Sequence, residues 1–227
     1  MDWSKLTDNP ADIETRKVLL KHLLSIRTVK EMSYTEYLKS LVKGKRVLDI
    51  GAAEHDLSHI KSPDWKHRIM RENCGYILGL DIVSDLVDYL SKQGYNFRCV
   101  DATTDIILGE YFDVVVIGDV IEHVDNPINL LKFAGRHISQ HGEIIVTTPN
   151  PFYHRYFFRN MRKGTFVANF EHTCWVTPSM ALEIARRSGL RLKSYICFRP
   201  EHKFQRLLSK VLSVETLVSS YTYVYGN

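Results

Sequence analysis

Between residues 46 and 148, short apolar segments alternate with amphipathic ones, and this alternation constrains the fold more than any other feature of the chain. The apolar segments are 46–50, 76–82, 96–102, 111–119 and 142–148. Segments such as 84–93 and 126–138, which lie between them, are amphipathic. Near-continuous apolar strands separated by helices predict a parallel sheet that is covered on both faces. We therefore expect an α/β protein with a doubly wound sheet.

The two ends of the chain add elements to this sheet. Capping residues and apolar spacing predict helices at 10–25, 33–42, 177–190 and, as one helix or two, 203–220. Ser33 and Thr177 are the expected N-caps, and Gly189 is the expected end of its helix. The remaining apolar runs predict strands at 191–198 and 221–225.

The length of 227 residues suits one sizeable domain. We expect a single domain, 1–227, in which residues 1–43 form an N-terminal helical cap and residues 149–176 form a separate insertion. No apolar run approaches the roughly 20 residues that span a bilayer. The polar N-terminus contains acidic residues and predicts neither a signal peptide nor a transit peptide.

Composition and charge exclude several classes of protein. With 44% hydrophobic and 25% charged residues the chain is an ordinary globular sequence, and a net charge of +4 is too small to indicate nucleic-acid binding. The four cysteines are scattered and form no CxxC pair, which predicts reduced thiols, a cytoplasmic location and no metal site. They are Cys74, Cys99, Cys174 and Cys197.

Acidic residues stand at the ends of four expected strands. In open α/β sheets, ligands bind beyond the carboxyl ends of the strands. Asp81 there could accept hydrogen bonds from a ribose diol, and Asp101 could accept one from an adenine amine. Asp49 could attract an ammonium group, while Gly51 would let the backbone approach a ligand closely. Asp119, after the fourth strand, is expected to line the same pocket.

The loop GAAEHDL that starts at Gly51 excludes one familiar ligand. A pyrophosphate site needs several glycines and free N–H groups at a helix N-terminus. This loop instead carries Glu54 and Asp56, whose charges would repel a diphosphate. A ligand with adenosine at one end and a cationic, phosphate-free tail at the other fits better, and S-adenosylmethionine is such a ligand.

Five motifs of this chain occur in the order found in a known family. VLDIGAAEHDLSHI, GLDIV, VDAT, FDVVVIGDVIEHVDNP and GEIIVTTPNP resemble successive motifs of the class I S-adenosylmethionine-dependent methyltransferases. The likeness covers about residues 45–198 and is strongest to the small-molecule group that includes ubiquinone-type and sugar methyltransferases. It implies a Rossmann-like, seven-stranded, mostly parallel sheet with strand order 3-2-1-4-5-7-6, in which 221–225 is the antiparallel strand.

The resemblance also implies which residues bind S-adenosylmethionine. They are Asp49, Gly51, Ala52, Ala53, Asp81, Ile82, Asp101, Ala102 and Asp119. Two features depart from the family pattern. Ala53 and His55 stand where the second and third glycines of the loop are usual, and His55 could narrow the methionine end of the pocket. The insertion 62–73 also places Asp81 further from Gly51 than the roughly 20 residues that are common. Cofactor binding is expected to survive both changes.

Two histidines are candidates for catalysis. His123, in the Glu122-His123 pair, follows the fourth strand, and His172 precedes the helix that Thr177 caps. A hydroxyl acceptor must lose a proton during methyl transfer, which suits a base with a pKa near 7, whereas an amine acceptor needs less help. The alternative is that each histidine is held by structural hydrogen bonds; His154 is a weaker third candidate.

The segment 149–176 stands where this family places a lid over the acceptor. It carries Arg155, Arg159, Arg162 and Lys163 among many aromatic side chains. These cations could clamp an anionic acceptor, such as a nucleotide-linked sugar, a phosphorylated glycan or a lipid head group. Alternatively the segment is a solvated helix that packs its aromatic residues on the core. The segment 203–220 could touch a membrane surface, although its apolar stripe also fits a core-facing helix.

The sequence thus predicts a methyltransferase that uses S-adenosylmethionine and acts on a small-molecule or glycan-type acceptor, at oxygen. A non-catalytic protein of the same fold that supports a partner subunit is the alternative. A dinucleotide oxidoreductase is disfavoured by the missing glycines and the acidic loop. Nucleic acid is an improbable substrate because GDVI stands where an NPPY-type tetrapeptide would be expected.

Overall fold

The computed structural model describes residues 1–54, 57–165, 167–198 and 213–227. Its strands are β1 (Arg27–Lys30), β2 (Arg46–Ile50), β3 (Tyr76–Asp81), β4 (Phe97–Cys99), β5 (Phe112–Gly118), β6 (Ile138–Pro149), β7 (Arg191–Phe198) and β8 (Ser220–Gly226). Its helices are α1 (Ile13–Ile26), α2 (Tyr34–Val42), α3 (Leu57–Lys61), α4 (Lys66–Arg71), α5 (Ser84–Lys92), α6 (Pro127–His137), α7 (His154–Lys163) and α8 (Pro178–Ser188). Two short 3₁₀ turns, η1 (Trp3–Lys5) and η2 (Val214–Thr216), complete the described elements.

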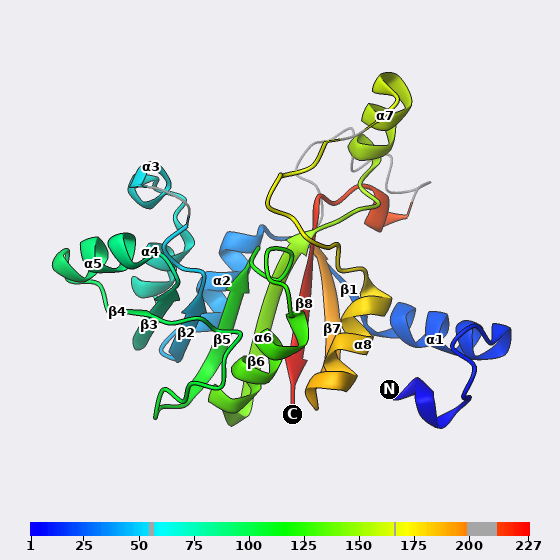
Figure 1. Cartoon of the computed structure of the whole chain (residues 1–227), viewed down its shortest axis with the longest axis horizontal. Coiled ribbons are helices and arrows are strands. Elements are labelled where there is room, and N and C mark those ends of the chain that lie inside the picture. The colour runs from blue at the N-terminus through cyan, green and yellow to red at the C-terminus, as the bar shows by residue number, and fades with distance from the viewer. Residues whose placement is uncertain (55–56, 166, 199–212) are drawn as a thin grey trace.

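The strands form one sheet of eight in the order β1-β7-β8-β6-β5-β2-β3-β4 (Figure 1). Strand β8 is antiparallel to β6 and to β7, and the other pairs are parallel. The order expected from the family resemblance is therefore confirmed for seven strands. The count is wrong by one, because β1 pairs with β7 and extends the edge of the sheet. The four residues of β1 follow α1 without a break, and so short a run in the expected helical cap gives no signal of its own.

Helices cover both faces of the sheet, as the alternating pattern predicts (Figure 1). Leu130 and Phe133 of α6 and Leu182 of α8 are buried in the larger core, together with side chains of β2, β3, β5 and β6. Leu38 of α2 and Met70 of α4 belong to a second core on the opposite face of the sheet. The strand side chains of this second core alternate along each strand with those of the larger core. A third cluster gathers Ala53, Trp65 and Phe97 around the loop that follows β2.

The helix ends agree with the capping residues. Ser33 and Glu36 form a reciprocal capping box at the start of α2. The Thr177 hydroxyl accepts a hydrogen bond from the Met180 backbone N–H, and Gly189 ends α8 in the left-handed conformation. These caps fix where α2 and α8 begin, and α8 follows directly after the segment that carries His172.

Two expected elements are shorter than the sequence suggests. Strand β4 ends at Cys99 rather than at residue 102, because the Asp101 carboxylate accepts hydrogen bonds from the backbone N–H and the hydroxyl of Thr103 and so forms a turn. The expected helix 203–220 falls partly on 203–212, outside the described residues. Residues 213–220, the described part of this segment, form η2 and the start of β8 and contain no α-helix.

The carboxyl ends of the parallel strands meet at one edge of the sheet. In Figure 1 this edge is at the top, and α7 stands above it, away from the body of the sheet. Among the residues described here, no helix is both long and apolar enough to cross a membrane.

Candidate active site

A cavity of about 1050 Å³ opens at the carboxyl edge of the sheet. Its walls come from the ends of β2, β3 and β5, from α2 and α4, and from the segment 217–222. Ligand pockets commonly measure about 300–1,000 Å³. The cavity is therefore large enough for a cofactor and a second, smaller molecule side by side.

Gly51 forms the floor of the cavity directly after β2. Its φ of +75° lies in the left-handed region, and a Cβ at this position would collide with the Val120 side chain. The Gly51 N–H donates to the Leu80 carbonyl at 2.9 Å and the Ala52 N–H to the same oxygen at 3.1 Å. The loop therefore turns tightly beneath the cavity, and this turn requires glycine.

Asp81 holds the loop after β2 in place. Its Oδ2 accepts a hydrogen bond from the Ala53 backbone N–H at 2.9 Å, and its Oδ1 accepts one from the Val83 N–H at 3.1 Å. Ala53 is fully buried, so a small side chain fits this position without a second glycine. His55, the other unusual residue of the loop, lies outside the described residues. Ile82 lines the cavity although 70% of its surface is exposed, and offers an apolar face to a ligand ring.

Asp49 is buried and paired with a histidine that the insertion 62–73 supplies. Its Oδ2 lies 2.9 Å from Nδ1 of His67 on α4. Burial raises the pKa of Asp49, and the contact with His67 opposes this rise. Nearby, the Trp65 indole N–H donates to the Ala52 carbonyl at 2.9 Å. The insertion thus supports the loop after β2 from below.

Asp119 lines the cavity from the end of β5. Its φ of +51° is unusual for a residue other than glycine. Its backbone N–H donates to the carbonyl and to the hydroxyl of Thr147, which fixes this turn. Asp101 and Ala102 are not among the described residues that line the cavity: Asp101 is exposed at its own turn, and Ala102 is buried in the core.

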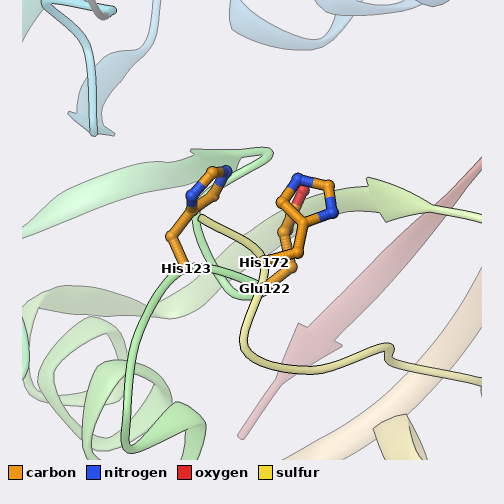
Figure 2. Close-up of side chains that lie close together, drawn as sticks. All are labelled: Glu122, His123 and His172. Atoms are coloured by element: carbon orange, nitrogen blue, oxygen red, sulfur yellow. The ribbon is translucent and has the colours of Figure 1, made fainter. Parts of the chain in front are cut away.

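Glu122, His123 and His172 meet beside the cavity (Figure 2). One nitrogen of each ring and one carboxylate oxygen all lie within 4.8 Å of one another. The two imidazole rings are perpendicular, with their centroids 4.8 Å apart. Of the three residues, His123 lines the cavity.

Backbone hydrogen bonds bring this cluster together from two distant segments. The Thr173 N–H and hydroxyl both donate to the Glu122 carbonyl, at 2.8 Å and 3.1 Å. The chain before α8 is therefore attached to the turn after β5, and His172 is placed against His123. We refer to Glu122, His123 and His172 as the Glu-His-His cluster.

The Glu122 carboxylate is 1% exposed, and neither of its oxygens has a hydrogen-bond partner in the described part of the chain. Burial raises the pKa of Glu122 to about 7. The Nδ1 of His172 is also buried without a partner among the described residues. Nδ1 of His123 lies 3.8 Å from the exposed Glu171 carboxylate.

Comparison with known proteins agrees with this geometry. Residues 25–195 match the model of a protein family described as a methyltransferase domain. This chain belongs to that family. Because the match covers most of the chain, the resemblance read from the sequence motifs is confirmed, and S-adenosyl-L-methionine is the cofactor expected of this methyltransferase.

Individual relatives support the same assignment. The methyltransferase is 26% identical over 206 residues to a ubiquinone biosynthesis O-methyltransferase of Coxiella burnetii, a match that covers 84% of this chain and 82% of the relative. Its fold is similar to that of an S-adenosylmethionine-dependent methyltransferase from Archaeoglobus fulgidus, with a TM-score of 0.60 at 16% identity over 93% of this chain and 99% of that one. A similar enzyme from Mesorhizobium loti gives a TM-score of 0.58 at 16% identity, covering 85% and 95% of the two chains.

The segment 149–176 of the methyltransferase forms α7 and a long loop. No residue of α7 is buried, and Phe157 and Phe158 are more than half exposed, so these aromatic side chains do not pack on the core. From this segment, Tyr153 and Glu171 line the cavity, whereas the four cations considered as a clamp are not among the described lining residues. His154 is attached elsewhere, with its Nδ1 2.9 Å from the Thr216 carbonyl.

Sequence reasoning missed three features of this site. His67 lies in the insertion 62–73, and Tyr34, in the helix expected at 33–42, lines the cavity. Glu122 was noticed only as the neighbour of His123. The Glu122-His123 pair and the downstream His172 together carry a sequence signal for the Glu-His-His cluster, whereas the scattered cysteines carry none for a metal site.

Proposed function

We propose that this methyltransferase moves a methyl group from S-adenosylmethionine to a hydroxyl oxygen of a small molecule. The Glu-His-His cluster beside the cavity is the observation that carries the proposal. A hydroxyl is a weak nucleophile until its proton is removed or its oxygen is polarised, and imidazole and carboxylate groups do this near neutral pH. The curated relatives are named as O-methyltransferases, which agrees with an oxygen acceptor.

The cofactor residues are part of the same proposal. Asp49 would attract the ammonium of the methionine tail, Asp81 would accept from the ribose, and Ile82 would cover one face of the adenine. Gly51 and Ala52 would line the methionine end, with Asp119 facing the acceptor side, while Ala53, which is not among the described lining residues, would support the loop from its buried position. Asp101 and Ala102 would reach the adenine through their backbone rather than through the exposed carboxylate.

The reaction is an in-line displacement. A lone pair of the acceptor oxygen forms a bond to the methyl carbon, the carbon–sulfur bond breaks, and its electrons stay on sulfur to give the neutral thioether S-adenosylhomocysteine. The acceptor proton leaves through the cluster to solvent. Because the sulfonium is already activated, positioning supplies most of the rate, and His123 and His172 are the residues proposed for the proton.

The acceptor itself is proposed by class only. A small phenol or a sugar hydroxyl suits the space beside the cofactor, and the cations of α7 favour acceptors that carry a negative charge at one end. The alternative of a membrane contact concerns the segment 203–220, of which residues 203–212 lie outside the described residues. The free cysteines, of which Cys99 is exposed, agree with a cytoplasmic location.

The test is an assay for S-adenosylhomocysteine release with panels of phenols, sugars and amines. We expect turnover with a hydroxyl acceptor, and a fall of at least about 100-fold in His123→Ala and His172→Ala, in line with the loss of a general base. His141→Ala, at an exposed position on β6, should behave as the wild type. Turnover with amines alone would contradict O-methylation.

A non-catalytic role is the alternative, and binding separates it from the proposal. The wild type should bind S-adenosylmethionine and S-adenosylhomocysteine in calorimetry. No response to either ligand at millimolar concentration would favour a protein that supports a partner subunit. For the α7 cations, Arg159→Ala with Arg162→Ala should raise the KM for an anionic acceptor, whereas Arg16→Ala on α1 should not.

A further inference from the structure

The Glu-His-His cluster contains an unexplained buried group. Glu122 is almost fully buried, and its two carboxylate oxygens have no hydrogen-bond partner among the residues that the structure describes. Buried polar groups in folded proteins nearly always have a partner, and a buried carboxylate without one destabilises the fold. The structure therefore keeps an unfavourable group at the edge of its cavity.

The groups that act on Glu122 are two imidazoles, the buried Thr148 hydroxyl and the Asp119 carboxylate. One nitrogen of His123 and one of His172 lie within 4.8 Å of the Glu122 oxygen and of each other. The buried Nδ1 of His172 also lacks a partner in the described part of the chain. The unpartnered Glu122 carboxylate and His172 Nδ1 therefore lie beside each other, with the His123 ring next to them (Figure 2), which points to a common ligand.

The chemistry of the donors selects the kind of ligand. Two histidine nitrogens and one carboxylate oxygen form the set that binds zinc or iron(II) at open catalytic sites, whereas magnesium and calcium prefer oxygen donors alone. Bond lengths of about 2.0–2.2 Å place neighbouring donors roughly 3–3.5 Å apart. The Thr173 hydrogen bonds to the Glu122 backbone carbonyl hold the two chain segments together, so side-chain rotation alone has to close the remaining distance between the donors.

We propose that Glu122, His123 and His172 bind one divalent transition-metal ion whose open positions face the cavity. The position of His123 on the cavity wall gives the ion access to an acceptor molecule. Given the proposed O-methylation, the ion binds the acceptor oxygen and lowers the pKa of its hydroxyl, so that the proton passes to solvent and the oxygen attacks the methyl carbon. In that case the two histidines are ligands, and neither is the base.

The test uses Co²⁺ and Zn²⁺ with the full chain after dialysis against a chelator. We expect one equivalent of Co²⁺ to bind with a visible absorption band, and Zn²⁺ to displace it. Glu122→Gln and His172→Ala should each weaken binding by at least about 100-fold, while His141→Ala should match the wild type. Binding of S-adenosylhomocysteine, measured in the same samples, should be unchanged in every variant and so shows that each one is folded.

The outcomes separate this inference from the proposed function. If Glu122→Gln and His172→Ala bind Co²⁺ as tightly as the wild type, or if the wild type binds none, the metal site is refuted even though the protein binds S-adenosylhomocysteine. If the ion binds as expected but no hydroxyl acceptor is methylated, the metal site stands and O-methylation fails.

Discussion

Two buried carboxylates meet histidines at the carboxyl edge of this sheet, and their surroundings differ. Asp49 is paired with His67 at 2.9 Å, inside a cluster of aromatic rings that includes Trp65 and Phe97. Glu122 lies within reach of two histidines, yet its oxygens have no hydrogen-bond partner in the part of the chain that the structure describes. Asp49 therefore has a side-chain partner within the protein, whereas the Glu122 oxygens have none among the described residues.

We infer from this difference that the two carboxylates have different roles. In the proposed account, the Asp49–His67 pair holds the loop after β2 in the conformation that binds the cofactor, and because the cofactor is always the same, the protein itself supplies the partner of Asp49. In the proposed account, the Glu122 oxygens and the Nδ1 of His172, which have no hydrogen-bond partner among the described residues, lower the stability of the protein and are available to a ligand that binds and leaves. Stability and function should therefore respond in opposite ways to mutations at the two places.

The largest effect on stability is expected at the paired carboxylate. His67→Leu leaves Asp49 buried without a partner, which should lower the free energy of unfolding by about 3–5 kcal/mol. Since about 1 kcal/mol corresponds to roughly 2–4 °C for a chain of this size, thermal unfolding should shift by about 6–20 °C. Adding Asp49→Asn should recover part of the loss, because asparagine carries no charge. A variant as stable as the wild type would show that the pair contributes nothing.

At the unpaired carboxylate the opposite is expected. Glu122→Gln removes a buried charge that the described structure does not compensate, so the melting temperature of the metal-free protein should stay the same or rise by a few degrees. Methyl transfer should fall by about 100-fold or more, which corresponds to about 2.7 kcal/mol of transition-state stabilisation. Calorimetric melting and initial rates measure the two effects. If Glu122→Gln lost as much stability as His67→Leu, the two carboxylates would not differ in how the protein compensates them.

A third carboxylate, Glu183, is paired with two arginine side chains, and this pairing lowers its pKa. The side chains of Arg186 and Arg187, together with the Trp3 indole, donate to Glu183 and lower its pKa to about 2, with Arg186 the largest cause. A carboxyl whose pKa is lower in the folded state stabilises the protein above its unfolded value near 4.5 and loses this contribution as the pH falls towards 2. Glu183→Gln should therefore cost about 1 kcal/mol at pH 7 and almost nothing once the pH is below about 2. An equal cost at both pH values would show that the ion pairs are not responsible.

Much of this arrangement could be predicted from the sequence. The spacing of apolar strands and acidic strand ends predicted the sheet, the loop at Gly51 and the cavity position, because these depend on local patterns and on the family motifs. Strand β1 could not be predicted, since its four residues become a strand only by pairing with β7, far along the chain. The pairing of Asp49 with His67 could not be predicted either, because it depends on how the insertion 62–73 folds against the sheet. The same holds for the proximity of His172 to Glu122, which depends on how a distant loop folds back.

The most direct test of the central claim is calorimetric titration of S-adenosylhomocysteine into wild type, Asp49→Asn and Glu122→Gln. If the first carboxylate serves the cofactor and the second the acceptor side, Asp49→Asn should weaken binding by about 10–100-fold, the worth of a charged hydrogen bond. Glu122→Gln should bind as the wild type does. Equal weakening in both variants, or no binding by the wild type at millimolar ligand, would contradict the account.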